Sequence, residues 1–183
     1  MLSKERKELE VLVQEMDPHL ASICPDADYL LSLPGWVFSQ SWGRAQQYEM
    51  MRNGIGWEDR TFYPKEFVDY IDDLGCLQIT AFSDGGVEKP KGLHWHIDDY
   101  WVYSWNIEGQ TTWHWFDMLE GTIKQEKIGE MDKVMLMPPQ TPHTVSVESE
   151  YRTSISIVRP QHWDGIKNGS ERNQVPKDYK GEY

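Results

Sequence analysis

The second half of the sequence contains short strand-like segments at regular intervals, and this regularity restricts the fold more than any other feature. From residue 77 to residue 158, apolar or alternating runs recur about every ten residues, with turn-forming residues between them. The predicted strands are residues 77–82, 93–98, 100–107, 110–116, 121–127, 133–137, 143–147 and 152–158. Many short strands at even spacing are typical of a β-sandwich or a β-barrel, so we expect a mainly β fold.

The segment before these strands reads as helices and connections. Residues 3–16 carry apolar side chains at the spacing of one helical face, which predicts an amphipathic helix ending at Asp17-Pro18. Residues 65–73 predict a second, shorter helix that turns Phe67, Tyr70 and Ile71 inward. Between the two helices we expect a connection at residues 25–35 and a short strand at residues 36–40.

The chain is expected to form a single structural domain with three parts. Residues 1–75 are expected to form an N-terminal segment that covers the barrel, residues 76–160 the barrel core, and residues 161–183 a polar tail. The two cysteines, Cys24 and Cys76, have no paired spacing, which argues against a disulfide framework or a zinc ribbon.

Charge and hydropathy indicate the kind of partner. The formal net charge of -12 argues against nucleic acid and anionic membrane, because both require a basic surface, and it favours a basic substrate. No signal-like apolar core and no apolar run of membrane-spanning length occurs, so we expect a cytoplasmic protein.

A candidate metal site begins in the strand at residues 93–98. His96 and Asp98 are two residues apart, and side chains at that spacing on a strand share one face. One histidine and one carboxylate are two of the three ligands of an open Fe(II) site, and His143 is the candidate for the third. His94 has the same parity as His96, so a centre with three histidines, suited to Fe, Ni, Cu or Zn, stays open.

Two predicted hairpins place further side chains on the face of these ligands. A turn at Glu108-Gly109 would set Asn106 opposite Thr111. A second turn at residues 148–151 would give His143, Arg152, Ser154 and Ser156 a common face. An arginine inside a barrel needs an anion, and its planar guanidinium suits a bidentate bond to a substrate carboxylate.

Two stretches of the sequence resemble the metal motifs of the Jumonji-type, cupin-like 2-oxoglutarate oxygenases, particularly the ribosomal-protein hydroxylase branch. Residues 77–113, with HIDDYWVYSWNIEGQTTW at their centre, resemble the first motif. Residues 132–157, DKVMLMPPQTPHTVSVESEYRTSISI, resemble the second, in which a Pro-Pro turn delivers the distal histidine. The resemblance implies a double-stranded β-helix, that is a cupin or jelly-roll barrel, with N-terminal helices packed on it.

The resemblance also implies a set of ligands and co-substrates. Fe(II) would be held by His96, Asp98 and His143, the residues of the catalytic centre, with 2-oxoglutarate as co-substrate and O2 as oxidant. In these relatives a basic residue two positions after the turn glycine binds the distal carboxylate of 2-oxoglutarate, and here that position is Thr111. A different branch uses an Arg-x-Ser pattern about nine residues after the distal histidine, which Arg152 and Ser154 match. The further candidate co-substrate contacts are Thr80, Tyr100, Asn106 and Thr111.

The function that follows is hydroxylation of a protein side chain or a small molecule. One alternative is a cupin dioxygenase or isomerase that does not use 2-oxoglutarate and binds its metal through His94, His96 and His143. Another is a cupin that binds a metal without catalysis. By analogy with related barrels, a homodimer is possible.

Overall fold

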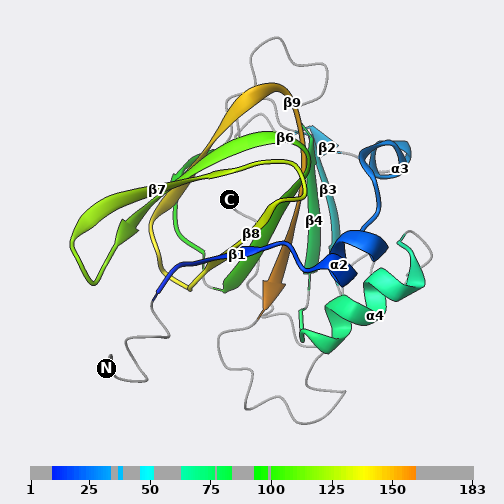
Figure 1. The fold of residues 1–183 in the computed structure, drawn as a ribbon, viewed down its shortest axis with the longest axis horizontal. Helices are drawn as coiled ribbons and strands as arrows, with labels where there is room; N and C mark the ends of the chain where they lie inside the picture. Colours follow the sequence, from blue (N-terminus) through cyan, green and yellow to red (C-terminus); the bar gives the residue numbers. More distant parts are fainter. Residues whose placement is uncertain are drawn as a thin grey trace.

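Two long strands form the frame of the molecule (Figure 1). The computed structural model describes residues 10–33, 37–38, 46–51, 63–76, 78–83, 93–98 and 100–159. Strands β6 (Trp101–Asp117) and β9 (His143–Arg159) pair antiparallel along nearly their whole length, from Trp101↔Arg159 to Trp115↔His143. The register shifts in the middle of this ladder, on both sides of Glu108 and Gly109. Each strand therefore has two halves that belong to different sheets.

The nine described strands pair in one continuous sheet, which folds into two layers, called here the first and the second sheet of a jelly roll. The first has the order β1 (Leu12–Glu15), β8 (Lys133–Met137), β6, β9, β4 (Gln78–Ser83), β3 (Gln46–Met51) and β2 (Val37–Phe38). The second joins β7 (Thr122–Ile128) to the later half of β6 and β5 (Leu93–His96) to the early half of β9. Two sheets that share two bent strands are a double-stranded β-helix, so the predicted fold class is confirmed.

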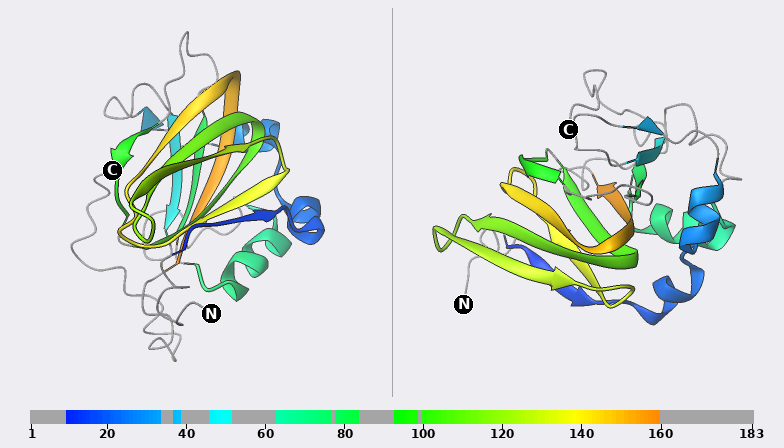
Figure 2. Two further views of the ribbon diagram at one scale, coloured as in Figure 1. Left: turned by 60° about the vertical axis from the view of Figure 1, so that its left-hand side comes forward. Right: turned by 90° about the horizontal axis from the view of Figure 1, so that it is seen from above.

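Apolar side chains fill both faces of the first sheet. Its outer face packs against α2 (Pro18–Ile23), α3 (Ala27–Ser32) and α4 (Lys65–Asp73), with Trp105 and Phe67 fully buried between sheet and helices. The three helices lie together on one side of the barrel (Figures 1 and 2). Inside the barrel is a second, inner cluster: Val102, Trp113, Trp115, Ile128, Met135, Met137 and Val145.

The prediction of a helix at residues 3–16 is wrong for the part that the structure describes. Residues Leu12–Glu15 are strand β1, which pairs with β8 at one edge of the first sheet. Val11 and Val13 pack against the inner cluster, so their alternation fits a strand. The free energy of pairing with β8 outweighs a helical pattern that is only a weak local preference.

Asp17-Pro18 begins helix α2, although proline after Asp17 predicted the end of a helix. The Asp17 carboxylate accepts a hydrogen bond from the backbone N–H of His19 at 2.8 Å, and Pro18 occupies the first turn of α2. Asp26 caps α3 in the same way, which puts a helix where a connection was predicted at residues 25–35. The prediction for α4 is confirmed, with Phe67 and Ile71 buried.

The two predicted hairpins are also wrong. The chain continues through Glu108-Gly109 as strand β6 and through residues 148–151 as strand β9. The prediction that Asn106 and Thr111 share a face is nevertheless correct. The register shifts at Glu108 and Gly109 change the alternation of side chains along β6, and a two-residue turn would have had the same effect. Asn106 and Thr111 both face the barrel interior, and the Asn106 side-chain amide donates to the Thr111 hydroxyl at 3.0 Å.

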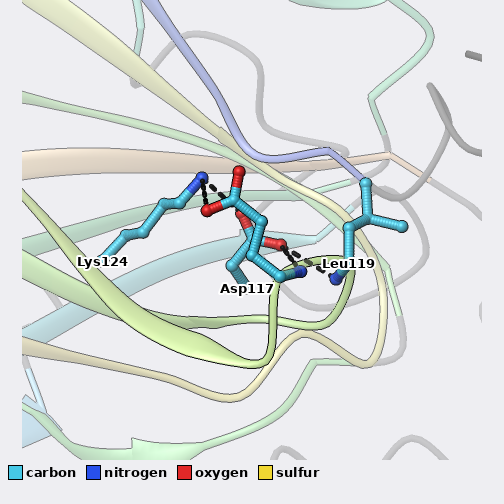
Figure 3. A network of polar contacts seen from close by, with 4 residues as sticks. Asp117, Leu119 and Lys124 are labelled. Atoms are coloured by element: carbon cyan, nitrogen blue, oxygen red, sulfur yellow. Dashed lines mark hydrogen bonds and ion pairs between the residues drawn. The ribbon is translucent and has the colours of Figure 1, made fainter.

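A polar network stabilises the turn between β6 and β7, a hairpin that extends beyond the barrel (Figures 1 and 3). The Asp117 carboxylate lies 2.7 Å from the Lys124 ammonium and accepts the backbone N–H groups of Leu119 and Glu120 at 2.9 and 3.0 Å. The bond from Lys124, followed by the backbone bonds, holds the pKa of Asp117 below its usual range. The Asp117 carboxylate therefore stabilises the turn between β6 and β7.

Two expectations concern other parts of the chain. The predicted polar tail, residues 161–183, lies outside the described residues. Among the helices that the structure describes, each is too short or too polar to cross a membrane.

Candidate metal centre

His96 and Asp98 come from the end of β5 and the residue pair that follows it. Side chains alternate here, so that Trp95 and Ile97 are 50% and 51% exposed while His96 and Asp98 are half-buried. The β5 to β9 register sets His96 opposite His143, and their ring centroids are 4.2 Å apart. Strand pairing thus brings together two histidines that are far apart in sequence.

Asp98 is held against the loop that leads into β9. The backbone N–H of Gln140 donates to the Asp98 carbonyl at 2.7 Å, and Gln140 has a left-handed backbone with φ 61°. This turn follows Pro138 and Pro139, which the sequence analysis associated with delivery of the distal histidine. The bond fixes the Asp98 backbone beside the start of β9.

His143 is almost completely buried, and its neighbours determine which ring nitrogen is available. Nδ1 lies 2.8 Å from the Thr141 carbonyl oxygen, which can only accept, so Nδ1 carries the proton. Burial, and next the charge of His96, lower the pKa of His143 to about 4 against the opposing effect of the Thr141 bond. The ring is therefore neutral at neutral pH and has a lone pair on Nε2, as a metal ligand requires.

The three side chains converge on one point. One nitrogen or oxygen of each of His96, Asp98 and His143 lies within 4.8 Å of the others. The Nε2 atom of His143 is 3.4 Å from Oδ2 of Asp98, so a nitrogen lone pair and a carboxylate oxygen face each other across a short gap. Two acceptors in this position repel unless a cation lies between them. The donor set therefore fits a divalent metal ion.

The alternative ligand His94 lies on β5, but its side chain is outside what the structure describes. Three residue steps on β5, from Leu93 to His96, span only two on β9, from Val145 to His143. The extra residue breaks the period-2 alternation between these two positions. The shift is placed only between Leu93 and His96, so this register does not decide the face of His94, and His94 as an alternative ligand stays a prediction.

The predicted carboxylate-binding residues also meet inside the barrel. Arg152 is 3% exposed, and its Nη1 donates to the Ser154 hydroxyl at 3.1 Å. The guanidinium carbon lies 5.7 Å from the centre of the Phe82 ring. Phe82 pairs with Ser154 across β4 and β9, and Ser154 pairs with Asn106 across β9 and β6. Arg152 thus lies beside a row of inward-facing residues on three adjacent strands.

The remaining predicted contacts have different positions. Asn106 donates to Thr111 and also, at 2.8 Å, to the Ile128 carbonyl, so its amide ties both halves of β6 to β7. Thr80 is buried on β4 opposite Ser156. Tyr100 is half-buried just before β6. The structure therefore groups Asn106 and Thr111 as a structural pair.

Sequence reasoning missed three features of this site. The Thr141 carbonyl selects the tautomer of His143, and the Trp113 ring stacks on His143 with centroids 5.6 Å apart and planes 20° apart. Ser156 donates to Ser104 at 2.9 Å within the barrel. The alternation did place Trp113 and Ser104 on the interior face, but no sequence pattern marks a backbone carbonyl as a partner of a ligand.

Comparisons with known proteins leave the family open. No protein-family model matches the sequence, and no curated protein matches it. An oxalate decarboxylase from Bacillus subtilis is 13% identical with a TM-score of 0.47, over 69% of this chain and 28% of that one. The enzyme from Lactobacillus farciminis, in a formate complex, is 6% identical with a TM-score of 0.47, over 69% and 31%. A Streptococcus pyogenes protein of unknown function is 17% identical with a TM-score of 0.37, over 47% and 67%.

This chain spans less than a third of the length of those oxalate decarboxylases. At such TM-scores the likeness carries no argument about activity, which must come from the site. The fold and the site together define a cupin-type barrel with a candidate metal centre of two histidines and one carboxylate.

Proposed function

We propose that the protein is an Fe(II)- and 2-oxoglutarate-dependent oxygenase that hydroxylates a protein side chain or a small molecule. The observation that carries the proposal is the approach of His143 Nε2 to Asp98 Oδ2 at 3.4 Å, with His96 beside them. Two histidines and one carboxylate with open positions are typical of non-haem Fe(II) oxygenases. Fe(II), with 2-oxoglutarate and O2, would supply the oxidising power for hydroxylation.

The chain's own residues hold and shield this centre. His96, Asp98 and His143 would hold the metal, while Thr141 keeps the His143 proton on Nδ1 and away from the metal side. The buried Trp113 ring covers one side of His143 and keeps water from it. In this proposal the protein contributes placement and exclusion of water, and needs no separate acid or base.

Arg152 supports the choice of 2-oxoglutarate. Its buried guanidinium faces the same interior as His143, and Ser154 and Phe82 restrict its position. A planar fork of donors in a low-dielectric interior suits the distal carboxylate of a dicarboxylic acid. Thr80 and Tyr100 are proposed as further contacts, while the Asn106 amide already donates to Thr111 and to the Ile128 carbonyl.

The role of Arg152 can be tested with two ligands that differ only at the distal end. We expect Zn(II)-loaded protein to bind 2-oxoglutarate about 10 to 100 times more tightly than 2-oxopentanoate, which has a methyl group in place of the distal carboxylate. Isothermal titration calorimetry measures both affinities in air, because Zn(II) has no redox chemistry.

The Arg152→Ala variant should lose this discrimination and bind the two ligands within about threefold of each other. Arg159→Ala, at the far end of the same strand, is the control and should keep it. Equal binding of both ligands by the wild type, with Zn(II) in place, would remove 2-oxoglutarate from the proposal and favour a cupin that uses another substrate.

A further inference from the structure

Among the residues that the structure describes, a single hydrogen bond restrains the His143 imidazole in its own plane. That bond, from Nδ1 to the Thr141 carbonyl at 2.8 Å, fixes the tautomer and one direction of the ring. A ring held at a single donor can still tilt about the axis of that bond. Tilting would move Nε2 away from Asp98, 3.4 Å away, so a second restraint decides whether the ligand is pre-positioned.

Trp113 supplies a flat surface in the position that opposes this tilt. Trp113 pairs with Val145 across β6 and β9, and His143 is the diagonal neighbour of Trp113 on the same interior face. The two rings stack with centroids 5.6 Å apart and planes 20° apart. Trp113 is itself fixed, because it is 7% exposed and belongs to the inner cluster.

We propose that Trp113 is a positioning residue that holds the His143 imidazole in the orientation in which Nε2 binds the metal. The inference rests on the proposed metal centre and adds a requirement to it: affinity for the metal depends on a flat aromatic face at residue 113. Outer-shell groups that orient a ligand typically change metal affinity about 10- to 100-fold.

Trp115 provides a matched control within the same strand. It is also 7% exposed, belongs to the same inner cluster and lies directly opposite His143 in the β6 to β9 ladder. The stack on His143, however, is made by Trp113. A loss of packing at either tryptophan should therefore destabilise the barrel similarly, whereas only a change at Trp113 should affect the metal ligand.

The test uses Co(II) alone as the probe, because its visible absorption reports both affinity and ligand geometry. Dissociation constants are measured for wild type, Trp113→Met, Trp113→Leu, Trp113→Phe and Trp115→Met, with thermal melts of each. We expect Trp113→Met and Trp113→Leu to bind Co(II) at least about tenfold more weakly, with an altered absorption band. Trp113→Phe, which keeps a flat ring, and Trp115→Met should remain within about threefold of wild type.

Two results would overturn the inference while the wild type still binds Co(II). One is unchanged affinity in both Trp113→Met and Trp113→Leu, and the other is an equal loss in Trp115→Met, which would show that general packing is responsible. Two non-aromatic variants are used so that the comparison does not depend on one of them folding. Failure of the wild type to bind Co(II) would instead contradict the metal centre itself.

Discussion

Replacing Asp98 with alanine is expected to weaken metal binding by at least about 100-fold, because the variant loses one of three ligands and the only negative charge among them. His94→Ala should stay within about threefold of wild type, because the proposed centre takes its ligands from His96, Asp98 and His143. Competition with a chromophoric chelator measures each affinity. Tight binding by Asp98→Ala together with loss in His94→Ala would indicate a centre of three histidines.

The same position allows a separate test of the repulsion between Asp98 and His143. In the metal-free protein an asparagine amide could donate to His143 Nε2, where the carboxylate oxygen now faces it at 3.4 Å. Asp98→Asn should therefore raise the free energy of unfolding of the metal-free protein by about 0.5–1.5 kcal/mol, measured in urea. Unchanged or lower stability would show that the two acceptors do not oppose each other.

Gly109→Ala adds one methyl group between β6 and β9. We expect it to lower the free energy of unfolding by about 3 kcal/mol, more than any other added methyl group in this ladder. Gly109 has φ +80°, and a Cβ there would lie 2.0 Å from the Tyr151 carbonyl oxygen and 2.5 Å from the Ser149 hydroxyl. The left-handed backbone costs roughly 1–2 kcal/mol, and overlap with the backbone of β9 adds roughly 1–3 kcal/mol.

Gly121→Ala separates the two terms. Gly121 also has positive φ, +68°, but an added Cβ would meet nothing within 4 Å. The free energy of unfolding of this variant should fall by only about 1 kcal/mol, which is the cost of the left-handed backbone alone. Urea unfolding of both variants gives the difference, and equal losses would mean that the close approach of β6 and β9 at Gly109 is not a tight contact.

The faces of the barrel strands could be predicted because alternation is a local property of the sequence. Period 2 placed Thr111 and Trp113 on one face, and the turn assumed at Glu108-Gly109 placed Asn106 on the same face; the structure agrees with these faces, although the strand continues where the turn was expected. Period 2 also predicted that His96 and Asp98 share a face, and His143, the later histidine after the Pro-Pro turn, was the candidate third ligand; the pairing of β5 with β9 brings the three together. The strand pattern thus predicts which side chains share a face, whereas the partner strand that completes the site follows from the pairing of β5 with β9.

Features that depend on pairing could not be predicted in this way. A single sequence does not show that β6 and β9 continue through Gly109 and Ser149, because glycine and polar residues also mark hairpins. The sequence of Leu12–Glu15 fits an amphipathic helix as well as it fits a strand. The pairing with β8 in the folded protein decides for the strand. The Thr141 carbonyl and the stack of Trp113 on His143 are likewise tertiary contacts.

The most direct test of the proposed function is an anaerobic titration of the Fe(II)-loaded protein with 2-oxoglutarate, followed by visible absorption. We expect a metal-to-ligand charge-transfer band in the wild type, because a 2-oxo acid that chelates Fe(II) gives one, and a weaker band at the same ligand concentration in Arg152→Ala. Absence of the band while Fe(II) stays bound would contradict a 2-oxoglutarate-dependent oxygenase and would leave a metal-binding cupin with a different reaction.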